Sequence, residues 1–371
     1  MAGCKRIGIL TSGGDAPGMN SAIRAATLVG LSLKADIVGI ERGYRGMLED
    51  AIVPLRPNDV ANILREGGTM LGSARCKEFH QREVRDKARA VLAKRGIDGL
   101  MVIGGNGSLT GAMRLADPAE CNGQELKVIG VPASIDNDLG LTGLSIGVDT
   151  AMNTIVEACD KIADTATAHD RTFIVEVMGR DCGYLAMTSA IAVGADLALF
   201  PEAGKPEADI VKQIVDTVLT IRRSGRKARR VIIIKAEGVS IPVDRLKTEV
   251  DRQLAATSPG DNPAEIETRV TVLGHVVRGG RPSAFDRLLG SRLANVAIRA
   301  LAAGQTHKMA SWMPAMELPE EIAARSPADP YIWLVDLGAV LAETENLLAG
   351  RSPLARWRAG AFSEIEDALL L

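Results

Sequence analysis

Two carboxylates lie in a segment that could carry acid–base chemistry. Asp136 and Asp138 follow the apolar run Val128–Val131, with Ser134 just before them. In an extended chain, side chains two residues apart point to the same side, so both carboxylates would face one ligand. One could accept a proton while the other orients it or holds a metal ion. The alternative is an Asx turn that begins the next helix, but neighbouring glycine-rich segments favour the chemical interpretation.

Two glycine-rich segments also follow apolar runs. Gly13-Gly14-Asp15 comes after Arg6–Leu10, and Gly104-Gly105-Asn106-Gly107-Ser108 comes after Gly99–Ile103. Glycine has no Cβ, so the free N–H groups at the start of a following helix can approach an anion closely. Two such loops side by side suit an extended polyphosphate, although a Gly-Gly pair can also be only a tight turn.

The usual nucleotide-binding fingerprints are absent from the sequence. It contains no GxxxxGK[ST] motif, so it is not a Walker-type NTPase. The segment Gly105–Gly111 misses GxGxxG by one residue, and no HRD and DFG pair marks a protein kinase.

Arginines supply the cationic half of the predicted site. Arginine binds phosphate bidentately and can stabilise a phosphoryl group in transfer. The candidates near segment ends are Arg75, Arg171, Arg180, Arg269 and Arg278. Each alone could be a solvated surface charge. His275 lies close to Arg278, and the Cys76 thiol beside Arg75 could have a lowered pKa, although we interpret it as an ordinary lining residue.

The elements that must position these residues alternate between short strands and longer helices. Helical spacing of apolar residues covers Ser21–Leu33, Val84–Arg95 and Thr150–Thr165, and a helix, a turn at Ser352-Pro353 and a final helix follow Leu341. Such alternation predicts doubly wound, mostly parallel α/β sheets, whose ligands bind beyond the carboxyl ends of the strands. The predicted strands are Arg6–Leu10, Ala35–Ile40, Gly99–Ile103, Val128–Val131, Phe173–Val177, Leu197–Phe200, Val231–Ile234 and Val270–Leu273.

Composition excludes several classes of protein. The 371 residues are 46% hydrophobic and 24% charged, which is typical of a globular protein of two domains. A net charge of −2 and 3% aromatic residues predict no nucleic-acid or anionic-membrane partner. Five scattered cysteines without a CxxC pair favour a reducing compartment, and no run of ~18 apolar residues predicts a membrane helix.

Six motifs together resemble the 6-phosphofructokinases, over residues 5–345. They are Ile9–Asn20, Gly72–Arg75, Gly104–Ser108, Ser134–Asp138, Val177–Arg180 and Leu273–Gly280. The resemblance implies two doubly wound α/β domains with the active site in the cleft between them. It assigns residues 1–147 and 277–313 to an ATP-binding domain, and residues 148–276 and 314–371 to a fructose-6-phosphate-binding domain.

The resemblance also implies the reaction, in which ATP phosphorylates fructose 6-phosphate at O1 as a step of glycolysis. Asp136 matches the general base, with Ser134, Asp138 and Arg180 as its catalytic neighbours, and Mg²⁺ would lie at Asn106 and Asp138. The residues matching the ATP site are Gly14, Tyr44, Arg75, Cys76, Gly105, Asn106, Gly107 and Ser108. Those matching the sugar-phosphate site are Ser134, Asp136, Arg171, Met178, Gly179, Arg180, Glu237, Arg269, His275 and Arg278. In the family Arg171 and Arg269 reach in from a neighbouring subunit, which implies a cytoplasmic homotetramer or homodimer.

Departures from the family pattern leave alternatives open. Gly107 and Ala133 stand where pyrophosphate-using relatives carry Asp and Lys, so ATP is the expected donor. Asn106 replaces the Mg²⁺-binding Asp of ATP-using members, and we expect lower but present activity. Leu28 and Pro57 stand where some members have arginines for a nucleotide effector, which argues against allosteric control of that kind. The alternatives are a kinase with another donor or sugar phosphate, and a ligand-binding relative without turnover.

Overall fold

The computed structural model describes residues 3–121, 125–224, 230–257, 267–313, 319 and 321–369, with side chains up to residue 362 in the last helix. The chain forms two compact units. Unit 1 comprises residues 1–135, 139–150 and 278–346, and unit 2 comprises residues 136–138, 151–277 and 347–371.

Unit 1 is built on an eight-stranded sheet in the order β11-β12-β10-β5-β4-β1-β2-β3. The strands from β10 to β2 are parallel to one another. β3 pairs antiparallel with β2 at one edge, and β12 pairs antiparallel with both β10 and β11 at the other. The central strands are almost continuously apolar and buried, as expected for strands covered on both faces. The strands are β1 (Arg6–Ser12), β2 (Asp36–Ile40), β3 (Ile52–Pro54), β4 (Gly99–Gly104), β5 (Lys127–Pro132), β10 (Lys308–Trp312), β11 (Ala323–Ser326) and β12 (Asp329–Asp336).

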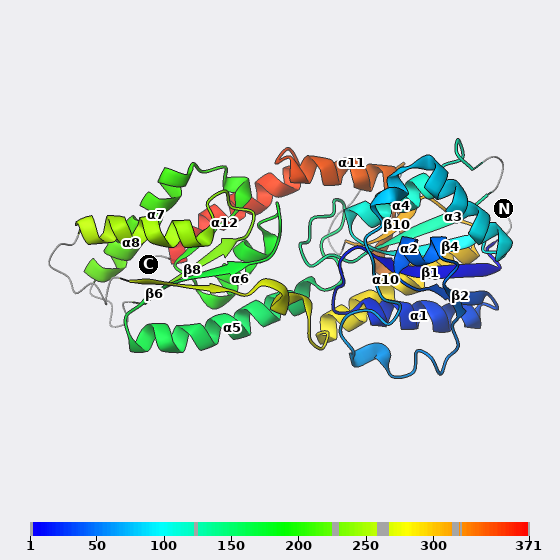
Figure 1. Ribbon diagram of the computed structural model, residues 1–371, viewed down its shortest axis with the longest axis horizontal. Coiled ribbons are helices and arrows are strands. Elements are labelled where there is room, and N and C mark those ends of the chain that lie inside the picture. The colour runs from blue at the N-terminus through cyan, green and yellow to red at the C-terminus, as the bar shows by residue number, and fades with distance from the viewer. Residues whose placement is uncertain are drawn as a thin grey trace. The chain divides into compact units, whose positions relative to one another are not determined.

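Helices cover both faces of the unit 1 sheet. Figure 1 shows α1 (Met19–Ser32) and α10 (Ala284–Ala302) side by side along one face, where they contact each other. The other face is covered by α2 (Gly43–Leu48), α3 (Arg82–Lys94) and α4 (Asn106–Leu115), whose apolar residues share one core cluster with the central strands. The unit also contains the short 3-10 helices η1 (Ile63–Arg65) and η2 (Lys77–His80), and α11 (Leu337–Leu348) follows the last strand.

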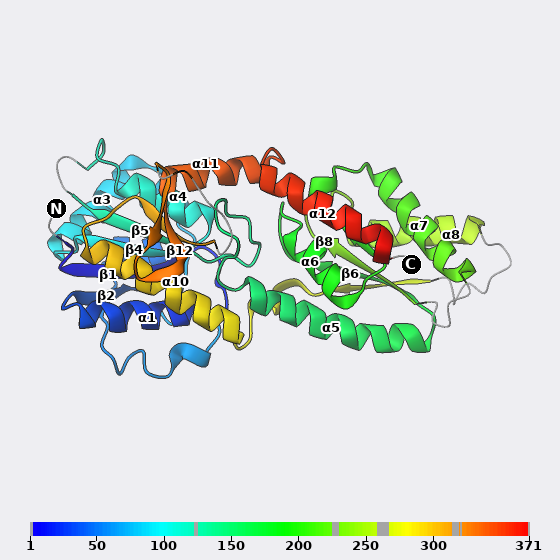
Figure 2. The ribbon, with the colours of Figure 1, turned by 180° about the vertical axis from the view of Figure 1, so that it is seen from behind.

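Unit 2 contains a smaller parallel sheet in the order β7-β8-β6-β9. Its strands are β6 (Thr172–Val177), β7 (Leu197–Leu199), β8 (Val231–Ala236) and β9 (Thr268–Val272). The helices are α5 (Val148–Ala168), α6 (Tyr184–Val193), α7 (Glu207–Arg223), α8 (Val243–Thr257) and α12 (Pro353–Leu369), with the 3-10 helices η3 (Pro201–Ala203) and η4 (Gly274–Arg278). Figure 2 shows α12 lying along the same unit as α6 and β8.

These elements confirm the predicted fold class. All eight predicted strands and all three predicted helices are present, with ends shifted by at most three residues. The two helices predicted near the C-terminus are α11 and α12. The predicted domain boundary at residue 313 differs from the division in the structure, because β12 pairs with β10 and thereby extends the unit 1 sheet.

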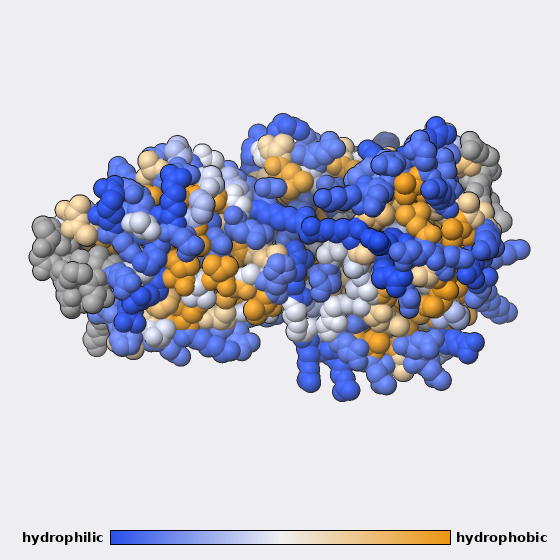
Figure 3. Space-filling model, viewed as in Figure 1, coloured by the Kyte–Doolittle hydropathy of each residue, from blue (hydrophilic) through white to orange (hydrophobic). Residues whose placement is uncertain are grey.

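The surface carries apolar residues in separate patches among hydrophilic ones on the face shown in Figure 3. Among the described residues, none of the helices is long and apolar enough to span a bilayer.

Candidate active site

The two predicted glycine loops lie side by side at the carboxyl ends of neighbouring strands of unit 1. Ser12, the last residue of β1, pairs in register with Gly104, the last residue of β4. The Ser108 hydroxyl donates a hydrogen bond to the Ser12 carbonyl at 2.8 Å. A Cβ on Gly104 would lie 2.5 Å from that same carbonyl oxygen, so only glycine permits this packing. The structure thus confirms that the two loops form one continuous edge.

The second loop ends in the N-terminus of α4. Gly105 precedes the helix in an extended conformation, and no side chain caps the helix. The first N–H groups of a helix have no intrahelical partner, so this terminus favours an anion. Gly107 is exposed, and a Cβ there would meet nothing within 4 Å. Asn106 is half-buried, and its carbonyl accepts a hydrogen bond from the Thr110 hydroxyl at 3.0 Å.

A third segment and one arginine join this edge. The Ser73 hydroxyl donates to the Gly13 carbonyl at 2.6 Å, which places the Gly72–Arg75 segment against the first loop. Arg75 itself is exposed. A Cβ on Gly14 would lie 2.7 Å from Nη1 of Arg278, so the missing side chain leaves room for that guanidinium. Two separate cationic side chains therefore lie near the glycine loops.

A cavity next to the first loop adds two arginines that sequence reasoning missed. It has a volume of about 520 Å³ and is lined by residues 65–68, Gly280 and Arg281. A Cβ on Gly67 would lie 2.3 Å from the Gly280 carbonyl oxygen, so two backbones approach closely here. The signal in the sequence was a pair of glycines in each segment with an arginine within two residues, as in Arg65-Glu66-Gly67-Gly68 and Gly279-Gly280-Arg281.

Two residues predicted for the nucleotide site have side chains that are buried in the protein interior. Tyr44 is 4% exposed, and its hydroxyl donates to the Ser108 carbonyl at 2.6 Å. Its ring stacks on Phe79 with centroids 4.0 Å apart. The Ser108 side chain is buried as well. Both residues support the loop edge from within.

The Cys76 thiol does not have the lowered pKa that a neighbouring arginine could give. Partial burial raises its pKa, and the Glu78 carboxylate, 3.6 Å from Sγ, raises it further. Arg75 itself is exposed. The assignment of Cys76 as an ordinary lining residue stays a prediction.

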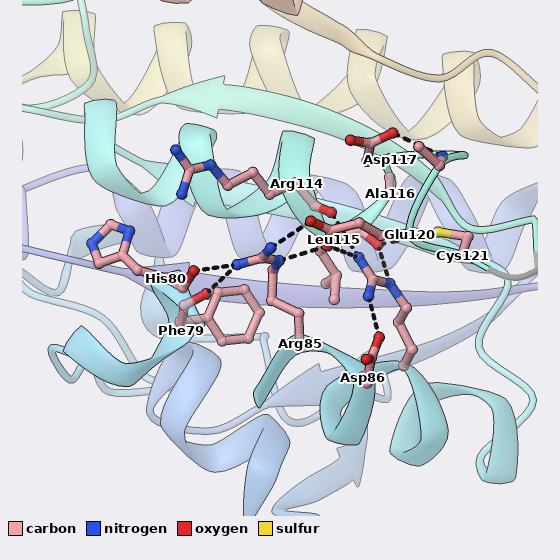
Figure 4. A network of polar contacts seen from close by, with 12 residues as sticks. Phe79, His80, Arg85, Asp86, Arg114, Leu115, Ala116, Asp117, Glu120 and Cys121 are labelled. Carbon is pink, nitrogen blue, oxygen red and sulfur yellow. Dashed lines mark hydrogen bonds and ion pairs between the residues drawn. The ribbon is translucent and has the colours of Figure 1, made fainter. Parts of the chain in front are cut away.

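Figure 4 shows a network of ion pairs that holds the segment following Cys76. Arg85 forms a bidentate pair with Glu120 at 2.9 and 2.6 Å, and Nη1 donates to the carbonyls of Phe79 and His80. Arg89 donates to the same Glu120 at 2.7 Å. The two guanidinium groups lower the pKa of the Glu120 carboxyl to about 2. Sequence reasoning missed this network, although positions 85 and 89 fall on the buried stripe of α3.

In unit 2, the segment after β6 is held by a carboxylate from the end of β8. Glu237 accepts hydrogen bonds from the backbone N–H groups of Gly179 and Arg180, at 3.3 and 2.9 Å. Both residues have positive φ, 146° for Gly179 and 50° for Arg180. A Cβ on Gly238 would lie 1.8 Å from the Arg180 carbonyl oxygen. The structure thus brings together Gly179, Arg180 and Glu237 as predicted.

The two acids occupy a turn that we call the acid turn, Asp136–Asp138, which belongs to unit 2. Oδ2 of Asp136 lies 3.4 Å from Nε of Arg180, and the side chains are 3% and 54% exposed, respectively. Asp138 is also buried. Asn137 between them has a φ of 51°, in the left-handed region. A buried carboxylate with a largely exposed guanidinium beside it can accept a proton next to a group that binds an anion.

The remaining predicted residues lie elsewhere. Ser134 lies in unit 1, where its Cβ would be 3.7 Å from a Cβ on Gly105, and Met178 is buried beside Gly179. Arg171 and Arg269 lie at the amino ends of β6 and β9, so the structure does not bring them to Arg180 at the carboxyl end. Arg269 pairs with Glu267 at 2.7 Å, and His275 is exposed in η4.

Among the described residues, no three His, Cys, Asp or Glu side chains come together in a cluster that would hold a cation. Asn106 in unit 1 offers a neutral oxygen and Asp138 in unit 2 an anionic one, and both are donors of the type that Mg²⁺ accepts.

Comparisons with known proteins agree with this geometry. The sequence model of the family described as phosphofructokinase matches residues 6–301. The ATP-dependent 6-phosphofructokinase of Staphylococcus epidermidis is 44% identical over 304 residues, which are 82% of this chain and 88% of that protein. The enzyme of the same name from Thermotoga neapolitana is 43% identical over 305 residues, 82% and 89% of the two chains.

Solved structures show the same fold. The phosphofructokinase of Pichia pastoris in the T-state superposes with a TM-score of 0.83 at 33% identity, over 99% of this chain and 42% of that longer chain. A pyrophosphate-dependent phosphofructokinase from Marinobacter aquaeolei, at 20% identity, matches with a TM-score of 0.72 over 91% and 83% of the chains. The match over most of the sequence confirms the resemblance seen in the motifs, and the chain belongs to the phosphofructokinase family.

Proposed function

We propose that this chain transfers the terminal phosphoryl group of ATP to the 1-hydroxyl of fructose 6-phosphate, giving fructose 1,6-bisphosphate and ADP in glycolysis. The observation that carries the proposal is the buried Asp136 carboxylate 3.4 Å from the exposed guanidinium of Arg180. The names of the curated relatives, which are ATP-dependent 6-phosphofructokinases, support the choice of donor and acceptor.

The proposed chemistry needs one base and one cation in the acid turn region. Asp136 accepts the proton from the 1-hydroxyl as that oxygen bonds to the γ-phosphorus, and the bond between that phosphorus and the β,γ-bridging oxygen breaks. Arg180 offers a free guanidinium face to the charge that spreads over the transferring group. Glu237 fixes the Gly179–Arg180 backbone through two hydrogen bonds, so Arg180 does not need to reorganise.

The donor site that we propose is the glycine-loop edge of unit 1. The N-terminus of α4 and the Gly13-Gly14 loop present N–H groups to phosphates, and Arg75 adds charge from the neighbouring segment. The open space at Gly107 leaves room for a nucleotide. When bound, Mg²⁺ would neutralise phosphate charge, and the oxygens that we assign to it are those of Asp138 and Asn106.

We also propose that the working enzyme is a cytoplasmic oligomer. Arg171 and Arg269 lie at the amino ends of their strands, away from Arg180, and this placement supports a role for them in the site of another subunit. Sedimentation of the purified protein measures its oligomeric state directly. A monomer that turns over at full rate would contradict the assignment of these two arginines.

The test is a coupled assay of fructose 6-phosphate and Mg²⁺ with ATP in one reaction and pyrophosphate in the other. We expect product with ATP only, and Asp136→Asn should lower kcat at least about 10³-fold. Asp181→Asn is the matched control, because Asp181 is an exposed carboxylate one residue from Arg180. Product with pyrophosphate alone would establish the other donor. Binding of both ligands without product would identify a relative in which Asn106 has abolished turnover.

A further inference from the structure

The C-terminal helix reaches the acid turn, although its sequence carries no recognisable motif. α12 begins after Ser352, whose hydroxyl accepts a hydrogen bond from the Leu354 N–H at 3.0 Å as an N-cap. Phe362 anchors the helix on unit 2, since it is 2% exposed and meets Phe200 edge-on at 5.4 Å. The helix also contacts α6, η3 and β7. α12 is therefore docked against the elements that surround the acid turn.

Arg358 lies one helical turn before Phe362, on the same face of α12. Its guanidinium carbon is 4.6 Å from the centroid of the Tyr184 ring, at the start of α6. Its Nη1 donates a hydrogen bond to the carbonyl of Asn137 at 3.4 Å. Tyr184 thus fixes the plane of the guanidinium while the hydrogen bond attaches it to the acid turn.

The carbonyl of Asn137 is a sensitive point of the acid turn. Asn137 adopts a left-handed conformation with a φ of 51°, which asparagine is one of the few residues besides glycine to adopt. The Cys182 thiol also points to this carbonyl, at 3.9 Å. A rotation of the peptide at residue 137 would turn both flanking carboxylates, so a donor that holds this oxygen also holds the direction of Asp136.

We propose that Arg358 is a positioning residue for the reaction, which aims the Asp136 carboxylate by holding the Asn137 carbonyl from the C-terminal helix. This inference rests on the role of Asp136 proposed above. It assigns a function to the C-terminal helix and predicts that the helix affects the chemical step rather than the binding of ATP.

The test compares Arg358→Met with Arg358→Lys. The Met variant keeps the apolar stem but removes the charge and the donor, and we expect kcat to fall about 10-fold to about 100-fold. The KM for ATP should stay unchanged, because the residues that we assign to ATP belong to unit 1. The Lys variant restores the charge and a donor without the planar stack, so it should recover part of the lost kcat.

The separation of kcat from KM distinguishes positioning from simple support of the fold. A fall in kcat at an unchanged KM for ATP, with part of the loss recovered by Arg358→Lys, is an effect that weaker packing alone would not produce. Arg356→Met is the matched control, because Arg356 is an exposed arginine of the same helix that bonds only to the Arg351 carbonyl among the described contacts. Thermal unfolding of all variants should stay at the wild-type temperature.

The outcomes distinguish this inference from the proposed function. If Asp136→Asn is inactive while Arg358→Met keeps the wild-type kcat, the positioning role is wrong and the base assignment stands. If Asp136→Asn retains activity, the assignment of Asp136 as the base is wrong. A Met variant that unfolds early is assayed at a temperature where it is folded, and a wild-type kcat there also overturns the proposal.

Discussion

The arginines of α3 and the arginine after β6 use the same chemical group for opposite purposes. Arg85 and Arg89 are nearly buried and share Glu120. Their other donors bond to backbone carbonyls and, for Nη1 of Arg89, to the Asp86 carboxylate at 2.7 Å. Arg180 is 54% exposed and makes a single 3.4 Å contact with Asp136. A guanidinium whose donors are used inside the protein holds structure, whereas one with open donors can hold a ligand.

This difference identifies function better than residue type does. Arg75, Arg180 and Arg278 are exposed or half-buried, as a ligand-binding arginine must be before its ligand arrives. Arg85 lies only ten residues from Arg75, but its guanidinium donates hydrogen bonds to backbone carbonyls of the loop and is not open to a ligand. The comparison therefore predicts that substitutions in the two groups affect different measurements.

Arg180→Met should have the largest effect, and on activity alone. We expect kcat with ATP and fructose 6-phosphate to fall about 10³-fold, because the transferring group loses its cation. The free energy of unfolding should change by less than about 1 kcal/mol, since the side chain is largely exposed.

The control for that measurement is Arg245→Met, an exposed arginine of unit 2 paired with Glu207 at 2.6 Å. It should leave kcat unchanged. A large loss of stability in Arg180→Met would place Arg180 among the structural arginines and break the comparison.

Glu120→Gln should have the second effect, and mainly on stability. The variant takes away the carboxylate that two nearly buried guanidinium groups share, which we expect to cost about 2–4 kcal/mol in urea unfolding. Glu157→Gln is the control, because its ion pair with Lys161 joins two side chains that are each 72% exposed. An equal loss of stability in both variants would contradict a special role for the network.

The ion pairs of Glu120 also predict how the stability depends on pH. The pKa of Glu120 is lowered from 4.5 to about 2, so its contribution is fully present above 4.5 and is lost as the pH falls to about 2. The wild type should therefore lose more stability than Glu120→Gln over this interval. Parallel unfolding curves for the two proteins would show that Glu120 is not paired in the folded state.

Asn106→Asp should have the smallest effect. It tests whether a side chain that we assign to the metal can bind Mg²⁺ more strongly when it carries a charge. A carboxylate at the start of α4 should lower the Mg²⁺ concentration for half-maximal activity by about fivefold. Met113→Asp adds the same charge at a 37% exposed position later in α4 and should not do so. No change in either rate or Mg²⁺ dependence would remove Asn106 from the metal site.

Much of the fold was predictable because buried parallel strands are continuous apolar runs. Four strands were not predicted, namely β3, β10, β11 and β12. β3, β10 and β11 are only three to five residues long, and β12 has exposed residues near its start. The two glycine loops were predictable as neighbours because both follow central strands. The pairing of Arg85 with Glu120 was not, because side chains 35 residues apart meet only through the packing of α3 on α4. Tyr44 was predicted for the nucleotide site, but its aromatic type also suits the core that it occupies.

The pairing of β5 with β10 has a consequence for how the protein is made. The Val128 N–H bonds to the Thr306 hydroxyl, 178 residues later in the chain, and β10 pairs with β5 in parallel. Residues 151–277 of unit 2 leave the ribosome between these two strands. At ordinary rates of synthesis, β5 waits about 10–35 s for its partner. During that time it is an unpaired apolar edge, so the nascent chain should depend on a chaperone until residue 312 has emerged.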